Sequence, residues 1–181
     1  MSEPPAKKTK TGWEEHLCNC NEALMKKDEV DHLTSISKSP VTILQGIGEK
    51  HNELLEHLGI KTVEDLASYK FYLMARALKT LAEVEEKDGR KAESVMNVDK
   101  AVDKAQEKLT FSDMVASPIH ILQGLSEKAE ELFKQLGVHT VSELAEFKYA
   151  RWAEAIVEMS KYENTLTETE RKVDRELHKL E

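Results

Sequence analysis

Two stretches of this 181-residue chain are near-copies of each other, and this internal repeat constrains the fold more than any other feature. Residues 39–86 and 117–164 align without a gap, and about 20 of the 48 aligned positions carry the same residue. Each copy begins with Ser-Pro, and Ser117 stands 78 positions after Ser39. Self-similarity at a fixed offset is typical of a structural unit that occurs twice. We therefore expect two similar units.

The composition indicates that these units are helical. Charged residues make up 33% of the chain and hydrophobic residues 40%, with only 7 Gly and 4 Pro. Glu, Lys, Ala and Leu dominate, and all four are good helix formers. The sequence predicts an all-α fold: duplicated units of about four helices each, followed by a C-terminal amphipathic helix.

The same types of residue mark the helix ends in both copies. Ser39 is expected to cap a short helix that Gly46 ends. A hairpin helix then runs from Gly48 to Gly59, and Thr62 opens a longer helix with a capping box. The counterparts in the second copy are Ser117, Gly124, Ser126, Gly137 and Thr140.

Apolar residues recur at steps of three and four along the longer helix, which predicts one buried face. A leading amphipathic helix is predicted before each copy, over residues 13–32 and 91–109, and residues 34–38 read as a polar connector. The expected buried face of the longer helix comprises Val63, Leu66, Ala67, Phe71, Met74, Leu78 and Leu81, and in the second copy Val141, Leu144, Ala145, Tyr149, Trp152, Ile156 and Met159.

The chain ends with a further predicted helix. Leu166, Val173, Leu177 and Leu180 are spaced seven, four and three apart, which is a narrow stripe of the coiled-coil type. At about two heptads this helix is too short for an independent coiled coil. We expect it to dock on the body of the protein or to pair with a partner helix, including that of a second copy.

The expected organisation has four parts. Residues 1–11 form a disordered tail, residues 12–88 the first helical unit, residues 89–164 the second, and residues 165–181 the C-terminal helix. No apolar run approaches the roughly 20 residues that span a bilayer, and the polar tail lacks the pattern of a secretory signal. We expect an intracellular, cytoplasmic protein, and Lys7–Lys10 leave a nuclear location open.

The repeated region resembles a known family. The strings at residues 44–50 and 58–66 are similar to those of the helix-hairpin-helix superfamily, in which a Gly-apolar-Gly hairpin joins two helices. The resemblance covers about residues 41–67 and 119–145, and the second hairpin is degenerate because Ser126 stands in place of the second glycine. It implies two tandem helix-hairpin-helix units. In DNA-binding members, the backbone N–H groups of the hairpin hold a phosphate without reading the base sequence.

The resemblance makes both hairpins candidate sites for a phosphate or for a partner protein. N–H groups at a helix start and the helix dipole both favour an anion. However, the chain carries a net charge of −8, acidic residues crowd both hairpin helices, and Lys50 and Lys128 are the only cations immediately beside the hairpins in the sequence. Charge therefore disfavours a nucleic acid. The candidate residues are Gly46, Ile47, Gly48, Lys50, Gly124, Leu125, Ser126 and Lys128.

The sequence favours a non-catalytic protein-protein interaction or scaffold protein, whose partner is another protein or a second copy. The alternative is non-sequence-specific DNA or RNA binding through the hairpin backbone. Phosphate-loop, zinc-protease and serine-hydrolase motifs are absent. His16, Cys18 and Cys20 lack the ligand number and spacing of a zinc site. We expect no catalysis, cofactor, metal or membrane partner.

Overall fold

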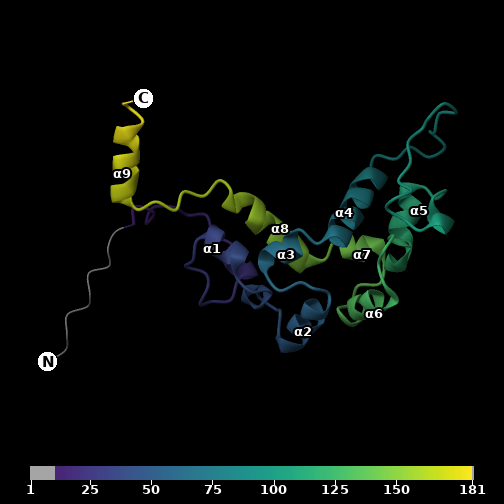
Figure 1. Cartoon of the computed structure of the whole chain (residues 1–181), viewed down its shortest axis with the longest axis horizontal. Helices are drawn as coiled ribbons and strands as arrows, with labels where there is room; N and C mark the ends of the chain where they lie inside the picture. Colours follow the sequence, from purple (N-terminus) through teal and green to yellow (C-terminus); the bar gives the residue numbers. More distant parts are fainter. Residues whose placement is uncertain (1–10, 181) are drawn as a thin grey trace.

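The structure is a computed structural model that describes residues 11–180, and within that range the fold is all-α, as the composition predicts (Figure 1). Apart from Thr11, the predicted tail lies outside the described residues. The α-helices are α1 (Leu33–Lys38), α2 (Glu49–His57), α3 (Val63–Ala67), α4 (Lys70–Ala82), α5 (Phe111–Ala116), α6 (Glu127–Gln135), α7 (Val141–Ala145), α8 (Lys148–Ser160) and α9 (Glu168–Leu177). The short 3-10 helices are η1 (Asn21–Ala23), η2 (Val41–Ile43), η3 (Lys104–Gln106) and η4 (Ile119–Ile121).

The bounds of five elements recur with the same offset as the sequence copies. α1, η2, α2, α3 and α4 recur as α5, η4, α6, α7 and α8, each 78 residues later. An isolated bridge between Pro40 and Thr62 likewise recurs between Pro118 and Thr140. We call residues 20–86 the first half of the chain and residues 98–164, at the same offset, the second half.

The long helix of each half packs on the other half. α4 lies against α5 and α7, whereas α8 lies against α1 and α3. The hairpin helices α2 and α6 lie side by side. Buried residues of both halves form one hydrophobic cluster. The two halves are thus interlocked, and each completes its core with a helix of the other.

Two glutamates tie the interlocked halves together at equivalent places. Glu85, just after α4, accepts hydrogen bonds from the N–H and hydroxyl groups of Ser112 at the start of α5, both at 2.8 Å. Glu163, just after α8, accepts bonds from the N–H and hydroxyl groups of Thr34 in α1, at 2.8 and 2.9 Å. The first N–H groups of a helix have no partner within it. Each half therefore supplies acceptors for the first N–H groups of the other half's first α-helix, and α5 has in addition its own N-cap, Thr110, which accepts from the N–H of Asp113 at 3.1 Å.

The predicted leading helices are wrong. Residues 13–32 contain only the short η1 as a regular helix, and residues 91–109 only η3. Instead, Leu24 and Val102 form isolated antiparallel bridges with the residues that follow η2 and η4. The backbone groups beside these two buried residues bond across the bridge, so they are not available for the bonds of a helix.

The region around each Ser-Pro pair also differs from the prediction. Residues 34–38 lie in α1, not in a polar connector, and Ile36 is buried there. Ser39 does not cap η2 but follows α1, and its hydroxyl donates to the carbonyl oxygen of Ser35 at 2.9 Å. Ser117 behaves in the same way at the end of α5.

The longer helix is divided in both halves. α3 ends at Ala67 and α4 begins at Lys70, because the backbone at Tyr69 is extended, with φ −63° and ψ 114°. The break turns α4 towards the other half, and its buried face shifts so that Leu81 is exposed. The buried residues are Phe71, Tyr72, Ala75 and Leu78 in α4 and Tyr149, Ala150, Ala153 and Ile156 in α8, while Met74 and Trp152 are half-buried and Met159 is exposed.

The predicted ends of α2 and α6 and the predicted starts of α3 and α7 are confirmed, but the short helix before each hairpin does not reach its glycine. It is the 3-10 helix η2 or η4, which ends at Ile43 or Ile121 and not at Gly46 or Gly124. Thr62 and Thr140 each form a complete capping box with the acidic residue three positions later. The N–H of Ile60 bonds to the carbonyl of Leu55, as expected where a glycine ends a helix. The four turn glycines, Gly46, Gly59, Gly124 and Gly137, have φ values of +99°, +80°, +89° and +78°.

The C-terminal helix α9 stands apart from the interlocked halves (Figure 1). None of its residues, all of which the structure describes, is buried. Arg171 of α9 lies over the ring of Trp13, with its guanidinium carbon 3.6 Å from the ring centroid. The expected docking on the body is therefore not seen. Among residues 11–180, no helix is long and apolar enough to cross a bilayer.

Candidate interaction sites

The first hairpin leaves the start of its helix uncapped. Gly48 stands at the N-cap of α2, where no side chain of the described residues forms a cap hydrogen bond. The first N–H groups of α2 therefore lack a side-chain acceptor. Gly48 and Lys50 are exposed, but Ile47 is buried in the core. Of the candidate residues of this hairpin, Ile47 is thus a packing residue.

The second hairpin is already capped from within. The hydroxyl oxygen of Ser126 accepts a hydrogen bond from the N–H of Ala129 at 3.1 Å. Leu125 is half-buried, whereas Gly124 and Lys128 are exposed. Because Ser126 satisfies one of the N–H groups that would hold an anion, this hairpin is the weaker of the two for a phosphate.

Each hairpin glycine lies against the start of the other half's long helix. The hydroxyl of Tyr149 in α8 donates to the carbonyl oxygen of Gly46 at 3.0 Å. At the second hairpin, the Nζ atom of Lys70 in α4 lies 3.7 Å from the position that a Cβ on Gly124 would take. Lys50 and Lys128 are the cations beside the hairpins in the sequence, but in space Lys70 lies beside the second hairpin as well. Sequence reasoning missed Lys70 because it belongs to the other half of the chain.

Lys70 and Lys148, the first residues of α4 and α8, share one arrangement. The Nζ atom of Lys70 lies 4.6 Å from the ring centroid of Phe71, and that of Lys148 lies 4.8 Å from the ring centroid of Tyr149. Lys70 and Lys148 are equivalent, and both precede an aromatic residue. This repeated Lys-aromatic pair shows in the sequence that the two positions are equivalent, but it does not show that Lys70 lies near the second hairpin.

The acidic side of α6 is partly neutralised by its own neighbours. Glu130 lies 3.2 Å from Nδ1 of His120 and 3.3 Å from Nζ of Lys134. Burial alone would raise the pKa of Glu130, but the hydrogen bonds and charges of His120 and Lys134 outweigh it and lower the pKa. Lys134 is therefore already engaged with a carboxylate, which weakens it as a phosphate ligand.

The third candidate site is the apolar stripe of α9. Val173 is 56% exposed and Leu177 59% exposed, and Leu180 beyond the helix is exposed as well. Leu166, at the other end of the stripe, is just exposed. All four predicted residues are therefore exposed, although Leu166 precedes the helix, which begins at Glu168. An exposed apolar stripe is the usual contact face of an amphipathic helix.

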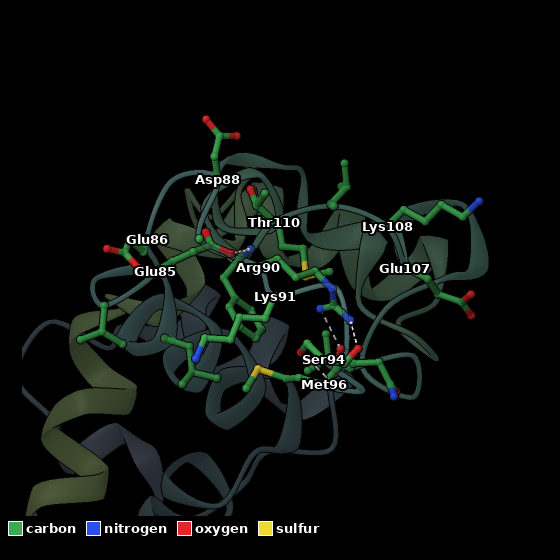
Figure 2. A pocket seen from close by; sticks show the side chains of 18 of the residues that line it. Glu85, Glu86, Asp88, Arg90, Lys91, Ser94, Met96, Glu107, Lys108 and Thr110 are labelled. Carbon is green, nitrogen blue, oxygen red and sulfur yellow. Dashed lines mark hydrogen bonds between the residues drawn. The ribbon is translucent and has the colours of Figure 1, made fainter.

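A cavity of about 1050 Å³ lies between the end of α4, the loop that follows it and the start of α5 (Figure 2). Across its wall, the guanidinium of Arg90 donates to the carbonyl oxygens of Ser94 and Met96, both at 3.0 Å. Glu85 also lines the cavity. Burial alone would raise its pKa, but the hydrogen bonds from the start of α5 lower it overall. Glu85 is therefore an ionised cap, and its role here is structural.

The side chains that most often bind metal ions are not clustered in the part of the chain that the structure describes. Residues 11–180 contain no group of three or more His, Cys, Asp or Glu side chains that could hold a metal ion. Cys18 is exposed, Cys20 is half-buried, and both are free thiols. Burial, with a smaller effect of Cys18, raises the pKa of the Cys20 thiol, which makes it a poorer nucleophile.

Comparison with known proteins assigns no family to the chain. A scan against protein-family models, a search of curated proteins and a search of solved structures each found no match.

Proposed function

We propose that this protein is a non-catalytic interaction scaffold in which two interlocked helix-hairpin-helix units hold α9 out as a docking helix for another protein. The observation that carries the proposal is the exposed stripe of Val173, Leu177 and Leu180 on a helix that buries none of its residues. An amphipathic helix gains stability when its apolar face is covered. The free thiols Cys18 and Cys20 support a reducing, intracellular location.

The charges beside the stripe indicate the chemistry of the partner. With about 3.6 residues per turn, Glu170 and Asp174 fall on one side of the stripe and Glu176 on the other. The cations Arg171 and Arg175 fall on the opposite face of the helix. Lys172 and Lys179 fall farther round on the side of Glu176, and Nζ of Lys179 lies 2.6 Å from Oε1 of Glu176. Two copies of α9 would therefore bring carboxylates together along their shared seam. A partner helix with an apolar stripe flanked by lysines or arginines fits better.

A labelled model peptide tests this proposal. The probe is a peptide of about three heptads with leucine at the two core positions and lysine at the flanking positions. We expect it to bind the full-length protein, with an affinity that falls as salt rises. Binding should be lost in the double variant Val173→Glu/Leu177→Glu and kept in the control Arg175→Gln, whose change lies on the opposite face. The docking role is refuted if all three proteins bind the probe equally or if none binds it.

Light scattering on the same proteins separates the two kinds of partner. If full-length protein self-associates and the double variant does not, then α9 pairs with a second copy. If both are monomeric at the concentrations used in the binding assay, then the stripe is open to a different protein, as proposed. Circular dichroism of the double variant should match that of the unmodified chain, because the changed residues are exposed.

A second candidate function, non-sequence-specific nucleic-acid binding, is supported by the cations at the hairpins. α2 and α6 lie side by side, α2 begins without a side-chain cap, and Lys70 stands at the second hairpin together with Lys128. Binding to duplex DNA that weakens steeply with salt, and weakens further in Lys50→Glu and Lys70→Glu, would support this function. Unchanged weak binding in both variants would exclude the hairpins.

A further inference from the structure

The packing of the two halves does not require that they belong to the same chain. α4 covers α5 and α7, and α8 covers α1 and α3, so the main helix contacts run between the halves. The reciprocal caps by Glu85 and Glu163 also run between the halves. A second copy of the chain could supply the same helices and the same caps.

The segment between the halves is long enough to allow this. Residues 87–97, all of which the structure describes, contain no helix and no buried residue. Eleven residues span up to about 40 Å when extended. Exchange of identical elements between copies needs no new interface, only a connection that can open. The segment at 87–97 has the reach and the exposure of such a connection.

One ion pair distinguishes correct from incorrect pairing of the halves. Nη2 of Arg76 lies 2.6 Å from Oε1 of Glu154, and the hydroxyl of Tyr72 donates to the other carboxylate oxygen at 2.7 Å. Glu154 stands 78 residues after Arg76, so the two occupy equivalent positions in the two halves. Two first halves would bring arginine against arginine, and two second halves glutamate against glutamate. Only a first half with a second half is matched in charge.

We propose that this chain exchanges halves with a second copy of itself, so that the first half of each copy packs on the second half of the other. The resulting dimer repeats every contact between the halves and carries two copies of α9 on one body. This exchange is independent of what α9 binds, because it rests on α4, α8 and the segment between the halves.

The length of the connection sets which form dominates. A short flexible linker holds its two ends at an effective concentration in the millimolar range. The closed monomer should therefore dominate at micromolar concentrations, and the exchanged dimer should appear only near millimolar concentrations. A perturbation that penalises the closed form and favours the exchanged one would bring the dimer into the micromolar range.

Two charge-reversed variants provide that perturbation. Arg76→Glu places two glutamates at the ion pair of its own closed monomer, and Glu154→Arg places two arginines there. When the two variants are mixed, the exchanged heterodimer restores two opposite-charge pairs at once. Exchange removes two like-charge pairs and forms two opposite-charge pairs. For partly exposed charges, each of these four changes should shift the equilibrium towards the dimer by about threefold to fivefold, so that the dimer is favoured by about 100-fold or more.

Mixing experiments with light-scattering detection test the proposal. The two full-length variants are mixed, incubated at mild denaturant concentration to open the connection, returned to native buffer and analysed at tens of micromolar. We expect each variant alone to be monomeric and the mixture to contain a dimer of one copy of each. If a single variant unfolds, mixing should restore its helical circular dichroism. A mixture that remains monomeric, or remains unfolded, overturns the proposal.

The double variant Arg76→Glu/Glu154→Arg is the matched control. Its closed monomer has the ion pair reversed but intact, so it should remain monomeric under the same treatment. A dimer of the double variant at the same concentration would show that exchange does not depend on this pair, and it would overturn the charge argument. The stripe variant Val173→Glu/Leu177→Glu should leave all of these outcomes unchanged, which separates this proposal from the role of α9.

Discussion

Replacement of Gly46 by alanine tests how firmly the first hairpin is held by the second half of the chain. Gly46 has φ +99°, and a Cβ there would lie 2.7 Å from the hydroxyl oxygen of Tyr149. A side chain in this left-handed conformation costs about 1–2 kcal/mol. Displacement of the buried Tyr149 from its 3.0 Å hydrogen bond costs about 1 kcal/mol more. We expect Gly46→Ala to lower the free energy of unfolding by about 2–3 kcal/mol.

Gly124→Ala is the matched control. Gly124 has nearly the same backbone, with φ +89°, but a Cβ there meets only the flexible end of Lys70 at 3.7 Å. Its cost should be the conformational part alone, about 1–2 kcal/mol. Urea denaturation followed by circular dichroism measures both variants, and the slope with urea should not change. The same pair of substitutions is then measured in a Tyr149→Phe background, where the excess cost of Gly46→Ala should disappear.

Two results would refute this reasoning. Equal destabilisation by Gly46→Ala and Gly124→Ala would mean that Tyr149 does not restrain the first hairpin. An excess cost of Gly46→Ala that persists without the Tyr149 hydroxyl would mean that the penalty arises elsewhere in the hairpin.

Three further predictions concern the contacts that join distant segments. Burial alone would raise the pKa of Glu163, but hydrogen bonds from the start of α1 lower it below 4.5. The stabilising effect of Glu163 is therefore present above pH 4.5 and is lost as the pH falls through the lowered pKa. Urea denaturation should show that Glu163→Gln destabilises the protein by about 2 kcal/mol at pH 7 and by less in acid, and an equal loss at every pH would contradict this. Arg171→Ala removes the cation that lies 3.6 Å from the Trp13 ring, so iodide should quench tryptophan fluorescence more strongly than in the control Arg175→Ala. Separately produced fragments of residues 11–86 and 98–180 should each show weak helical circular dichroism and regain it on mixing, whereas two independently folded fragments would contradict the interlocked packing.

The helix ends of the hairpin regions could be predicted because their signals are local. Thr62 lies three residues before the acidic partner that completes its capping box, and Gly59 needs only its own left-handed backbone. The leading helices were predicted incorrectly because a spacing of three and four does not show which residues reach the core. Leu17 and Val95 are apolar residues of these two segments, yet they are 89% and 88% exposed. Leu24 and Val102 are buried, and they are held by bridges instead of by a helix.

The interlocked packing and part of the candidate site depend on contacts that no local pattern encodes. The face of α4 that is buried includes Tyr72 and Ala75, because α5 and α7 of the other half cover it. The bond between Tyr149 and Gly46 joins residues 103 positions apart. Lys70 reaches Gly124 in the same way from the other half. The glycines of the hairpins could therefore be identified from the sequence, whereas the side chains that surround them could not.

The reciprocal caps have a consequence for synthesis on the ribosome. Glu163 caps the start of α1, so the N-terminal cap of α1 cannot form until a residue about 130 positions later has been synthesised. At about 5–20 residues per second, this delay lasts from roughly 6 to 26 seconds. During that interval the nascent first half presents the apolar surface that α8 will later cover. Neighbouring ribosomes on one messenger RNA would hold several such chains close together. At that stage a first half can pack on the second half of its own chain or on that of a neighbouring chain.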